Sequence, residues 1–523
     1  MAHEVVAGPV RPAEAPGNRA GVPDSHTDPA DHPGRRHRRP GPPFGVTTFV
    51  LTQGVLFFWW AARRPGLFSP DSLDHVWQAT TGHWNSHHPL AYTGLVWLSI
   101  RLTGGVGALT LAQACTLAVG VTYAATGLRR LGGPAWAWAA AAVAVVSLPP
   151  VGAFVVCVWK DVPYVICHVF LLGTLARLVR WRRAGAHPPF PGVLLAAVLV
   201  ELTLLCLLRQ NGFLVAAVVT GVVALVVRGT APRVLSVGVV AVTVGLLTNW
   251  VLPPAAGVRD DDVIVAYETV FADLAVGYAA DPQGFPAEDA ALLAAVAPLA
   301  HWRTSANCYT VDPTVHHADF DRRAAAARRG DLLAAWWRLV RRAPATVLAA
   351  RWCRASIAWR PTAAGVLSRT PTAWALPIYL DRDPRFRDDR VRAVAASEPL
   401  GEPVARLAET LTRRAGEPEW LFWRGATWAY LAYLVVGLVA WRRRERALLV
   451  LAGLSLGNQL SVLVVNNAQA ARYMAAPLVL GVLLLPLVAA GPPRARSARV
   501  APSPDRAGTP PLSVSDITIS PAG

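Results

Sequence analysis

Residues 191–228 read PGVLLAAVLVELTLLCLLRQNGFLVAAVVTGVVALVVR, two apolar runs separated by the polar sequence Arg209-Gln210-Asn211-Gly212. Each run has about the length that an α-helix needs to cross the hydrocarbon core of a bilayer. The acidic residue inside the first run, Glu201, is of a kind that membrane helices carry rarely. The stretch therefore predicts two membrane-spanning helices whose polar turn lies at one membrane surface.

The same pattern recurs along the chain. The protein has 523 residues, of which 53% are hydrophobic and 16% charged, and its mean hydropathy of +0.35 is too high for an ordinary soluble protein. Runs of spanning length are predicted at 44–62, 106–128, 134–158, 162–179, 191–208, 212–228, 233–251, 422–440, 447–466 and 473–490. The predicted fold class is an all-α polytopic membrane protein with about ten transmembrane helices and a large extracytoplasmic loop.

The basic residues indicate the orientation of these helices. The net charge is +17, but the arginines lie in short clusters between apolar runs, which favours cytoplasmic anchors over nucleic-acid binding. If the shorter run 89–103 lies in the membrane interface, every major arginine cluster falls on the cytoplasmic side. We therefore predict a multi-pass protein of the cell membrane with both termini in the cytoplasm.

This topology divides the chain into five parts. Residues 1–43 are expected to form a disordered basic tail, and 491–523 a second disordered cytoplasmic tail. Between them we predict a transmembrane catalytic module at 44–251, an extracytoplasmic segment at 252–421 and C-terminal transmembrane helices at 422–490. The first outer loop of the catalytic module covers residues 63–105.

The six cysteines show no metal-binding or redox spacing. Four of them fall in or beside apolar runs and are interpreted as small hydrophobic residues. Cys308 and Cys353 fall in the predicted extracytoplasmic segment, where a disulfide could form. The sequence alone does not place their Cα atoms within bridging distance, so this pairing stays open.

Chemically active side chains concentrate on the predicted outer face. The first outer loop carries several polar residues that we regard as candidates for catalysis or substrate binding. They are Asp71, Asp74, Gln78, His87 and His88. A carboxylate such as Asp71 could act as a general base on an acceptor hydroxyl, whereas the alternative is that Asp71 merely caps the following helix.

A second group of candidates contains Asp161, which we regard as a second catalytic acid, and the single lysine of the chain, Lys160, which lies directly before it. A compact ammonium group suits a phosphate, although a salt bridge or helix cap is the simpler interpretation. The remaining candidates for substrate binding are Arg209, Asn211, Arg472 and Tyr473. Arginines on the outer face oppose the usual charge distribution, and an anionic phosphate is their natural partner.

The run Arg259-Asp260-Asp261-Asp262, together with Glu268, could bind a divalent cation as a cofactor. A solvated run of charges explains these residues more simply, so no metal ligands are assigned.

These motifs together resemble the polytopic glycosyltransferases of the GT-C fold that use lipid-phosphosugar donors, including the protein O-mannosyltransferase and aminoarabinose-transferase types. The matching elements are PDS with a following Gln and HHP, then KDV, RQNG and finally Arg472-Tyr473 with Pro477. The resemblance implies an inverting transfer from a polyprenyl-phosphate sugar to a lipid, polysaccharide or protein acceptor. It also implies Asp71 as the base, and Lys160, Arg209 and Arg472 as ligands of the lipid phosphate.

Two other classes of protein fit part of the pattern. A secondary transporter or lipid flippase would account for the spans and for Glu201 inside one of them. A non-catalytic scaffold that binds an envelope partner would account for the long outer segment. The scaffold should tolerate alanine at Asp71, whereas the glycosyltransferase should not.

Overall fold

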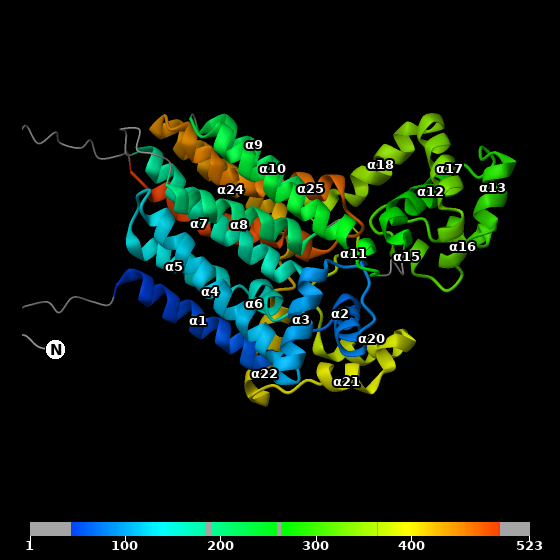
Figure 1. Cartoon of the computed structure of the whole chain (residues 1–523), viewed down its shortest axis with the longest axis horizontal. Helices are drawn as coiled ribbons and strands as arrows, with labels where there is room; N and C mark the ends of the chain where they lie inside the picture. Colours follow the sequence, from blue (N-terminus) through cyan, green and yellow to red (C-terminus); the bar gives the residue numbers. More distant parts are fainter. Residues whose placement is uncertain (1–42, 184–190, 228, 259–262, 363–364, 492–523) are drawn as a thin grey trace, which may run out of the picture. The chain divides into compact units, whose positions relative to one another are not determined.

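The computed structural model describes residues 43–183, 191–227, 229–258, 263–362 and 365–491 (Figure 1). Across these residues the chain is all-α, as predicted, and its β-structure consists of two isolated β-bridges. The tails predicted at the two ends lie outside the described residues, apart from Pro43 and Gly491.

Six helical units of the described chain are long and apolar enough to cross a membrane. They are α1 (Phe44–Arg63), α4 (Gly107–Arg129), α7 (Asp161–Arg183), α10 with η1 and α11 (Ala231–Ala255), η5 with α25 (Arg446–Val464), and η6 with α26 and η7 (Ala471–Ala489). All six coincide with apolar runs in the sequence, because hydropathy reflects local composition. These helices fit the multi-pass membrane protein that the composition predicts.

The run predicted to span the membrane at 134–158 is not one continuous helix. The segment forms two helices, α5 (Ala135–Ser147) and α6 (Pro149–Val155), whose axes differ by 66°. Leu148 between them is extended, with φ −61° and ψ 124°. Two consecutive prolines follow, and proline disfavours a helical conformation in the residue before it. The bent pair makes a seventh candidate span if it is counted as one.

The remaining apolar runs form shorter or more polar helices. α8 (Gly192–Leu208) and α9 (Gly212–Val226) are apolar but short, and α24 (Gly425–Arg443) ends in two arginines. α3 (Leu90–Thr103) has 14 residues, so it is about 21 Å long and shorter than the hydrocarbon core. By length and composition, the described residues thus contain six or seven candidate spans, and α8, α9 and α24 are not among them.

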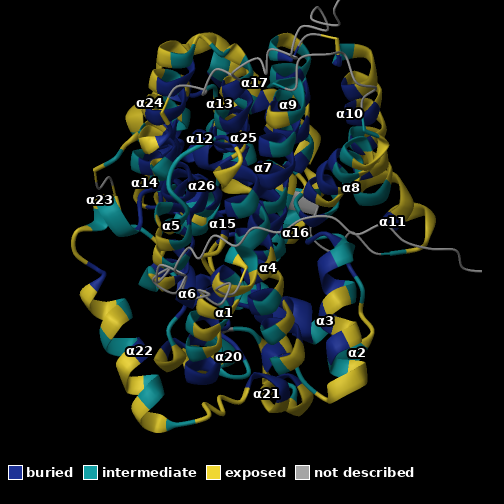
Figure 2. Ribbon diagram, turned by 90° about the vertical axis from the view of Figure 1, so that its left-hand side faces the viewer, coloured by how far each residue is buried: buried dark blue, intermediate teal, exposed yellow. Residues whose placement is uncertain are grey.

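Helix α7 is the most buried of the candidate spans, with 83% of its apolar window inside the protein (Figure 2). It packs against α4, α8 and α26. At its crossing with α4, a Cβ atom on Gly173 would lie 3.1 Å from the Cα atom of Ala124. Small residues at such a crossing let two helix backbones approach closely.

The arginine-rich helix ends meet on one side of the bundle. Arg183 at the end of α7 binds both carboxylate oxygens of Glu445, at 2.5 and 2.7 Å. Arg183 and Arg443 both donate to the carbonyl oxygen of Leu131, at 3.0 and 2.8 Å. The basic ends of α4, α7 and α24 therefore share one face of the protein.

The segment between α11 and α24 builds a second hydrophobic core from short helices. They are η2 (Val263–Tyr267), α12 (Glu268–Ala280), α13 (Ala287–Ala294), α14 (Leu299–Thr304), α15 (Asp312–Val315), α16 (Arg322–Ala327), α17 (Arg329–Arg342) and α18 (Pro344–Arg354). The helix that follows, α19 (Ser356–Trp359), packs against α24 and α25 instead. Cys308 and Cys353 form a disulfide in this segment, with their Cα atoms 5.6 Å apart. Buried Asp273 on α12 binds Arg354 of α18 at 3.0 Å.

Further helices complete this segment. They are η3 (Ala373–Ala375), α20 (Leu376–Arg382), η4 (Pro384–Arg387), α21 (Asp389–Ala395), α22 (Glu402–Arg414) and α23 (Glu419–Phe422). α21 and η4 pack against α2 (Pro70–Thr81), whereas α22 packs against α1. Figure 1 shows α20 and α21 beside α2, so the first loop is covered by chain from far along the sequence.

Candidate functional site

Two backbone bridges assemble the candidate site from distant loops. Leu67 accepts from the backbone N–H of Val158 and donates to the carbonyl of Val156, both at 3.0 Å. This pairing places the start of α2 beside the start of α7. Likewise, Ser368 donates to the carbonyl of Gln469 at 2.7 Å, which places the long segment beside η6 (Ala471–Met474).

Asp71 lies in the first turn of α2, but it does not cap the helix. Ser69 is the cap, because its hydroxyl accepts from the Ser72 N–H while the Ser72 hydroxyl accepts from the Ser69 N–H. The interpretation of Asp71 as a helix cap is therefore wrong. Its carboxylate instead lies 2.8 Å from the Arg472 guanidinium, and 30% of its side chain is exposed.

A second ion pair joins Asp161, at the start of α7, to Arg209, which follows α8, at 3.0 Å. The Asp161 side chain is 2% exposed, so we interpret it as holding Arg209 in place rather than as a second catalytic acid. Tyr473 links the two pairs, because the guanidinium groups of Arg209 and Arg472 lie 5.1 and 5.4 Å from its ring centre.

Arg472 also lies 4.8 Å from the ring centre of Trp159, a residue that sequence reasoning did not assign to the site. The Trp159 indole N–H donates to the Ser69 hydroxyl at 2.7 Å. The signal that could have identified it is its position directly before the single lysine.

Lys160 donates to Nδ1 of His88 at 2.6 Å. Burial lowers the pKa of Lys160 to about 8, although Asp71 and Asp161 oppose this shift. Burial and the charge of Lys160 hold the pKa values of His88 and His75 well below their usual range. Both imidazoles are therefore neutral at pH 7.

The charges around Asp71 control its ionisation. Burial would raise the pKa of this carboxyl, but the positive charges of Arg472 and Lys160 outweigh burial and hold the pKa well below its usual range. Asp71 is thus ionised throughout the physiological pH range. Two carboxylates face three cations, which leaves one positive charge in excess and favours the binding of an anion such as a phosphate.

Asp74 and Gln78 form a separate network on α2. The amide of Gln78 donates to Asp74 at 2.7 Å and to Asn85 at 3.0 Å. Arg385 of η4 donates to the other oxygen of Asp74 at 3.0 Å. These contacts tie the first loop to the long segment, so we interpret Asp74 and Gln78 as structural rather than as substrate ligands. Nothing in the sequence indicates Arg385 as their partner.

The two remaining candidates, Asn211 and His87, differ in their surroundings. Asn211 donates to the hydroxyl of Ser461 at 2.8 Å and so joins α9 to α25. His87 stays with the site, because its ring centre lies 4.3 Å from that of His88.

The acidic run at 259–262, considered as a cation site, lies outside the described residues. Its partner in that prediction, Glu268, is buried and accepts from the Asn467 amide at 3.1 Å.

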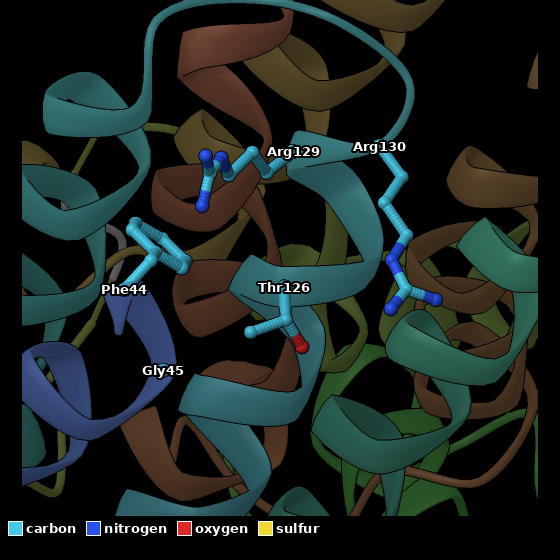
Figure 3. Close-up of a pocket in the computed structure, with 5 residues that line it drawn as sticks. All are labelled: Phe44, Gly45, Thr126, Arg129 and Arg130. Carbon is cyan, nitrogen blue, oxygen red and sulfur yellow. The ribbon is translucent and has the colours of Figure 1, made fainter. Parts of the chain in front are cut away.

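A pocket in the described part of the chain lies elsewhere, at the opposite end of α1 from the loop that carries Asp71 (Figure 3). It is lined by Phe44, Gly45, Thr126, Arg129 and Arg130. Helix α1 has 20 residues and is about 30 Å long, which separates this pocket from the ion pairs at the other end of the helix.

Comparison with protein-family models, curated proteins and solved structures finds no match to this chain.

Proposed function

We propose that this protein is a membrane glycosyltransferase of the GT-C type, which moves a sugar from a polyprenyl-phosphate donor to an acceptor with inversion. The observation that carries the proposal is the convergence of Lys160 and Arg472 around a partly exposed carboxylate, Asp71, with Arg209 beside the Tyr473 ring that Arg472 also contacts. A phosphate and a general base are what this transfer needs at one site.

The proposed topology has ten crossing helices, including α8, α9, α24 and the bent pair of α5 and α6. The arginine-rich ends would face the cytoplasm, following the distribution of basic residues. The ion pairs of Asp71 and Asp161 would then lie on the extracytoplasmic side, where the long segment covers them. The acceptor would be a lipid, polysaccharide or protein of the cell envelope.

In the proposed reaction, the acceptor hydroxyl oxygen attacks the anomeric carbon while the bond from that carbon to the phosphate oxygen breaks. Asp71 takes the hydroxyl proton, and polyprenyl phosphate leaves with the bonding electron pair. Lys160, Arg209 and Arg472 stabilise the charge that develops on the leaving phosphate. A single displacement of this kind inverts the anomeric configuration.

The ion pair between Asp71 and Arg472 adds a control on the base. Paired in this way, the carboxylate has a low pKa and accepts protons weakly. A donor phosphate would compete for the Arg472 guanidinium, and weakening the pair would raise the pKa of Asp71. Base strength would thus increase when the donor binds.

The test is transfer of radiolabelled sugar from a panel of polyprenyl-phosphate sugars in membranes that contain the wild type or Asp71→Asn. We expect the variant to lose at least about 100-fold in rate while its protein level and its phosphate binding remain. Asp381→Asn is the matched control, because Asp381 forms an exposed pair with Arg392 on the long segment. Equal rates for Asp71→Asn and the wild type would refute the assignment of the base.

A transporter is the second candidate, and one observation favours it. Glu201 lies 8% exposed within α8, where one carboxylate oxygen accepts from Thr174 at 2.8 Å. Buried carboxylates in membrane helices often serve ion or proton transport. Substrate-dependent uptake into vesicles that is abolished in Glu201→Gln, without any sugar transfer, would favour this class.

A further inference from the structure

Two histidines and an aspartate converge in the long segment, away from the site of Asp71. One ligand atom from each of His301, His317 and Asp319 lies within 4.8 Å of the others. His301 belongs to α14 and is 5% exposed, whereas the other two are exposed on the connection between α15 and α16. We propose that these three side chains bind a zinc ion.

The buried histidine is held in the form that binds metal. Nε2 of His301 lies 2.9 Å from the carbonyl oxygen of Thr314. A carbonyl only accepts, so Nε2 carries the proton and Nδ1 keeps its lone pair. A ring nitrogen that donates to a backbone carbonyl while the other nitrogen faces the metal is the usual arrangement of a metal-binding histidine.

The exposed pair presents two electron-rich atoms to each other. The backbone N–H of Asp319 donates to Nδ1 of His317 at 3.2 Å, so this nitrogen carries no proton, and a metal ion bound there would take its lone pair in place of this long hydrogen bond. Oδ2 of the Asp319 carboxylate lies 3.5 Å from the same nitrogen. A cation near both atoms removes their repulsion.

The short connection that carries His317 and Asp319 is anchored on both sides. Before it, the carbonyl of Val315 accepts from Arg322 at 2.9 Å. After it, the ring of Phe320 lies 5.8 Å from that of Trp302, the neighbour of His301, and the N–H of Asp321 donates to the carbonyl of Val296 at 2.9 Å. The backbone is therefore held near α14, while the exposed side chains can still rotate.

The donor set suits zinc. Two imidazole nitrogens and one carboxylate oxygen are ligands that zinc takes at about 2.0–2.2 Å, with water completing four-fold coordination. Tetrahedral bonds of that length place the ligand atoms about 3.4 Å apart. The ligand atoms observed here lie within 4.8 Å of one another, so side-chain rotation of His317 and Asp319 has to shorten these separations by at most about 1.4 Å.

The neighbouring His316 offers a matched control. Its Nε2 lies 3.6 Å from Glu268 and 4.0 Å from Asp312, and it is outside the cluster of three ligands. It has the same residue type and a similar position in the sequence, but a different set of partners.

The experiment titrates zinc into full-length protein purified in detergent and stripped of metal, in competition with a fluorescent chelator. We expect His317→Ala and Asp319→Asn each to remove one equivalent of zinc that the wild type binds with a Kd below about 1 µM. His316→Ala should keep that equivalent. The histidines near the N-terminus are the same in all variants, so they cancel in the comparison.

The outcomes are separable. Loss of at least about tenfold in affinity in both ligand variants, with His316→Ala unchanged, supports the site. Equal binding by the wild type and His317→Ala, or loss in His316→Ala alone, overturns it. Because both substituted residues are exposed, thermal unfolding of the metal-free proteins should match that of the wild type. This inference does not depend on any transferase activity.

Discussion

Raising the pH from 7 to 9 should weaken phosphate binding at the candidate site by about tenfold, because Lys160 loses its charge in this interval. Its pKa is about 8. The pKa is lowered from the usual value of a lysine, so the ammonium form is present below pH 8 and is lost above it. The charged fraction falls from about nine-tenths at pH 7 to about one-tenth at pH 9. If the phosphate requires the ammonium group, affinity falls by the same ratio.

The other charges of the site do not change over this interval. The pKa of Asp71 lies well below it, and His75 and His88 are neutral throughout, because their pKa values are lowered. A phosphate monoester has its second ionisation near pH 6, so it is already doubly charged. Lys160→Arg should therefore bind with an affinity that is independent of pH, since a guanidinium keeps its proton.

The assay is isothermal titration of a short polyprenyl phosphate into detergent-purified protein between pH 7 and 9. Comparing buffers with different ionisation enthalpies also counts the protons taken up on binding. Near pH 8 the wild type should take up a fraction of a proton, and Lys160→Arg none. A wild-type affinity that stays constant from pH 7 to 9, or the same decline in Lys160→Arg, would refute the reasoning.

Three further predictions concern the stability of the fold, and thermal unfolding in detergent checks each. Cys308→Ser removes the disulfide and should cost about 2–4 kcal/mol, and reductant should destabilise the wild type but leave the variant unchanged. Asp273→Asn leaves the buried guanidinium of Arg354 without its counter-charge and should cost about 3–5 kcal/mol, so a variant as stable as the wild type would contradict this pairing. Gly152→Ala would place Cβ 2.1 Å from the Trp59 indole and should cost about 1–3 kcal/mol, whereas an unchanged melting temperature would show that the contact relaxes freely.

The sequence by itself determined the helical, membrane-type character of the chain. The apolar run at 44–62 corresponds to α1, and the run at 162–179 lies within α7. Such runs are local in sequence, so hydropathy identifies them without knowledge of the fold. The break at Leu148 was missed because the run 134–158 is long and apolar, although the prolines that cause the break stand in it. A hydropathy window averages over the one residue at which the helix ends.

Tertiary structure alone decided which charged groups meet. The sequence indicated Asp71, Lys160, Arg209 and Arg472 as candidates, but not that Asp71 would pair with Arg472. It likewise left open whether Cys308 and Cys353 pair, and gave no sign that Arg385 would bind the α2 network.

These partners lie far apart along the chain and are brought together by the packing of α7 against α8 and α26, by the packing of η4 against α2, and by single backbone bridges between loops. Hydropathy and charge patterns are one-dimensional. They show where helices begin and end. Which helix ends become neighbours depends on the simultaneous packing of many side chains from distant parts of the chain.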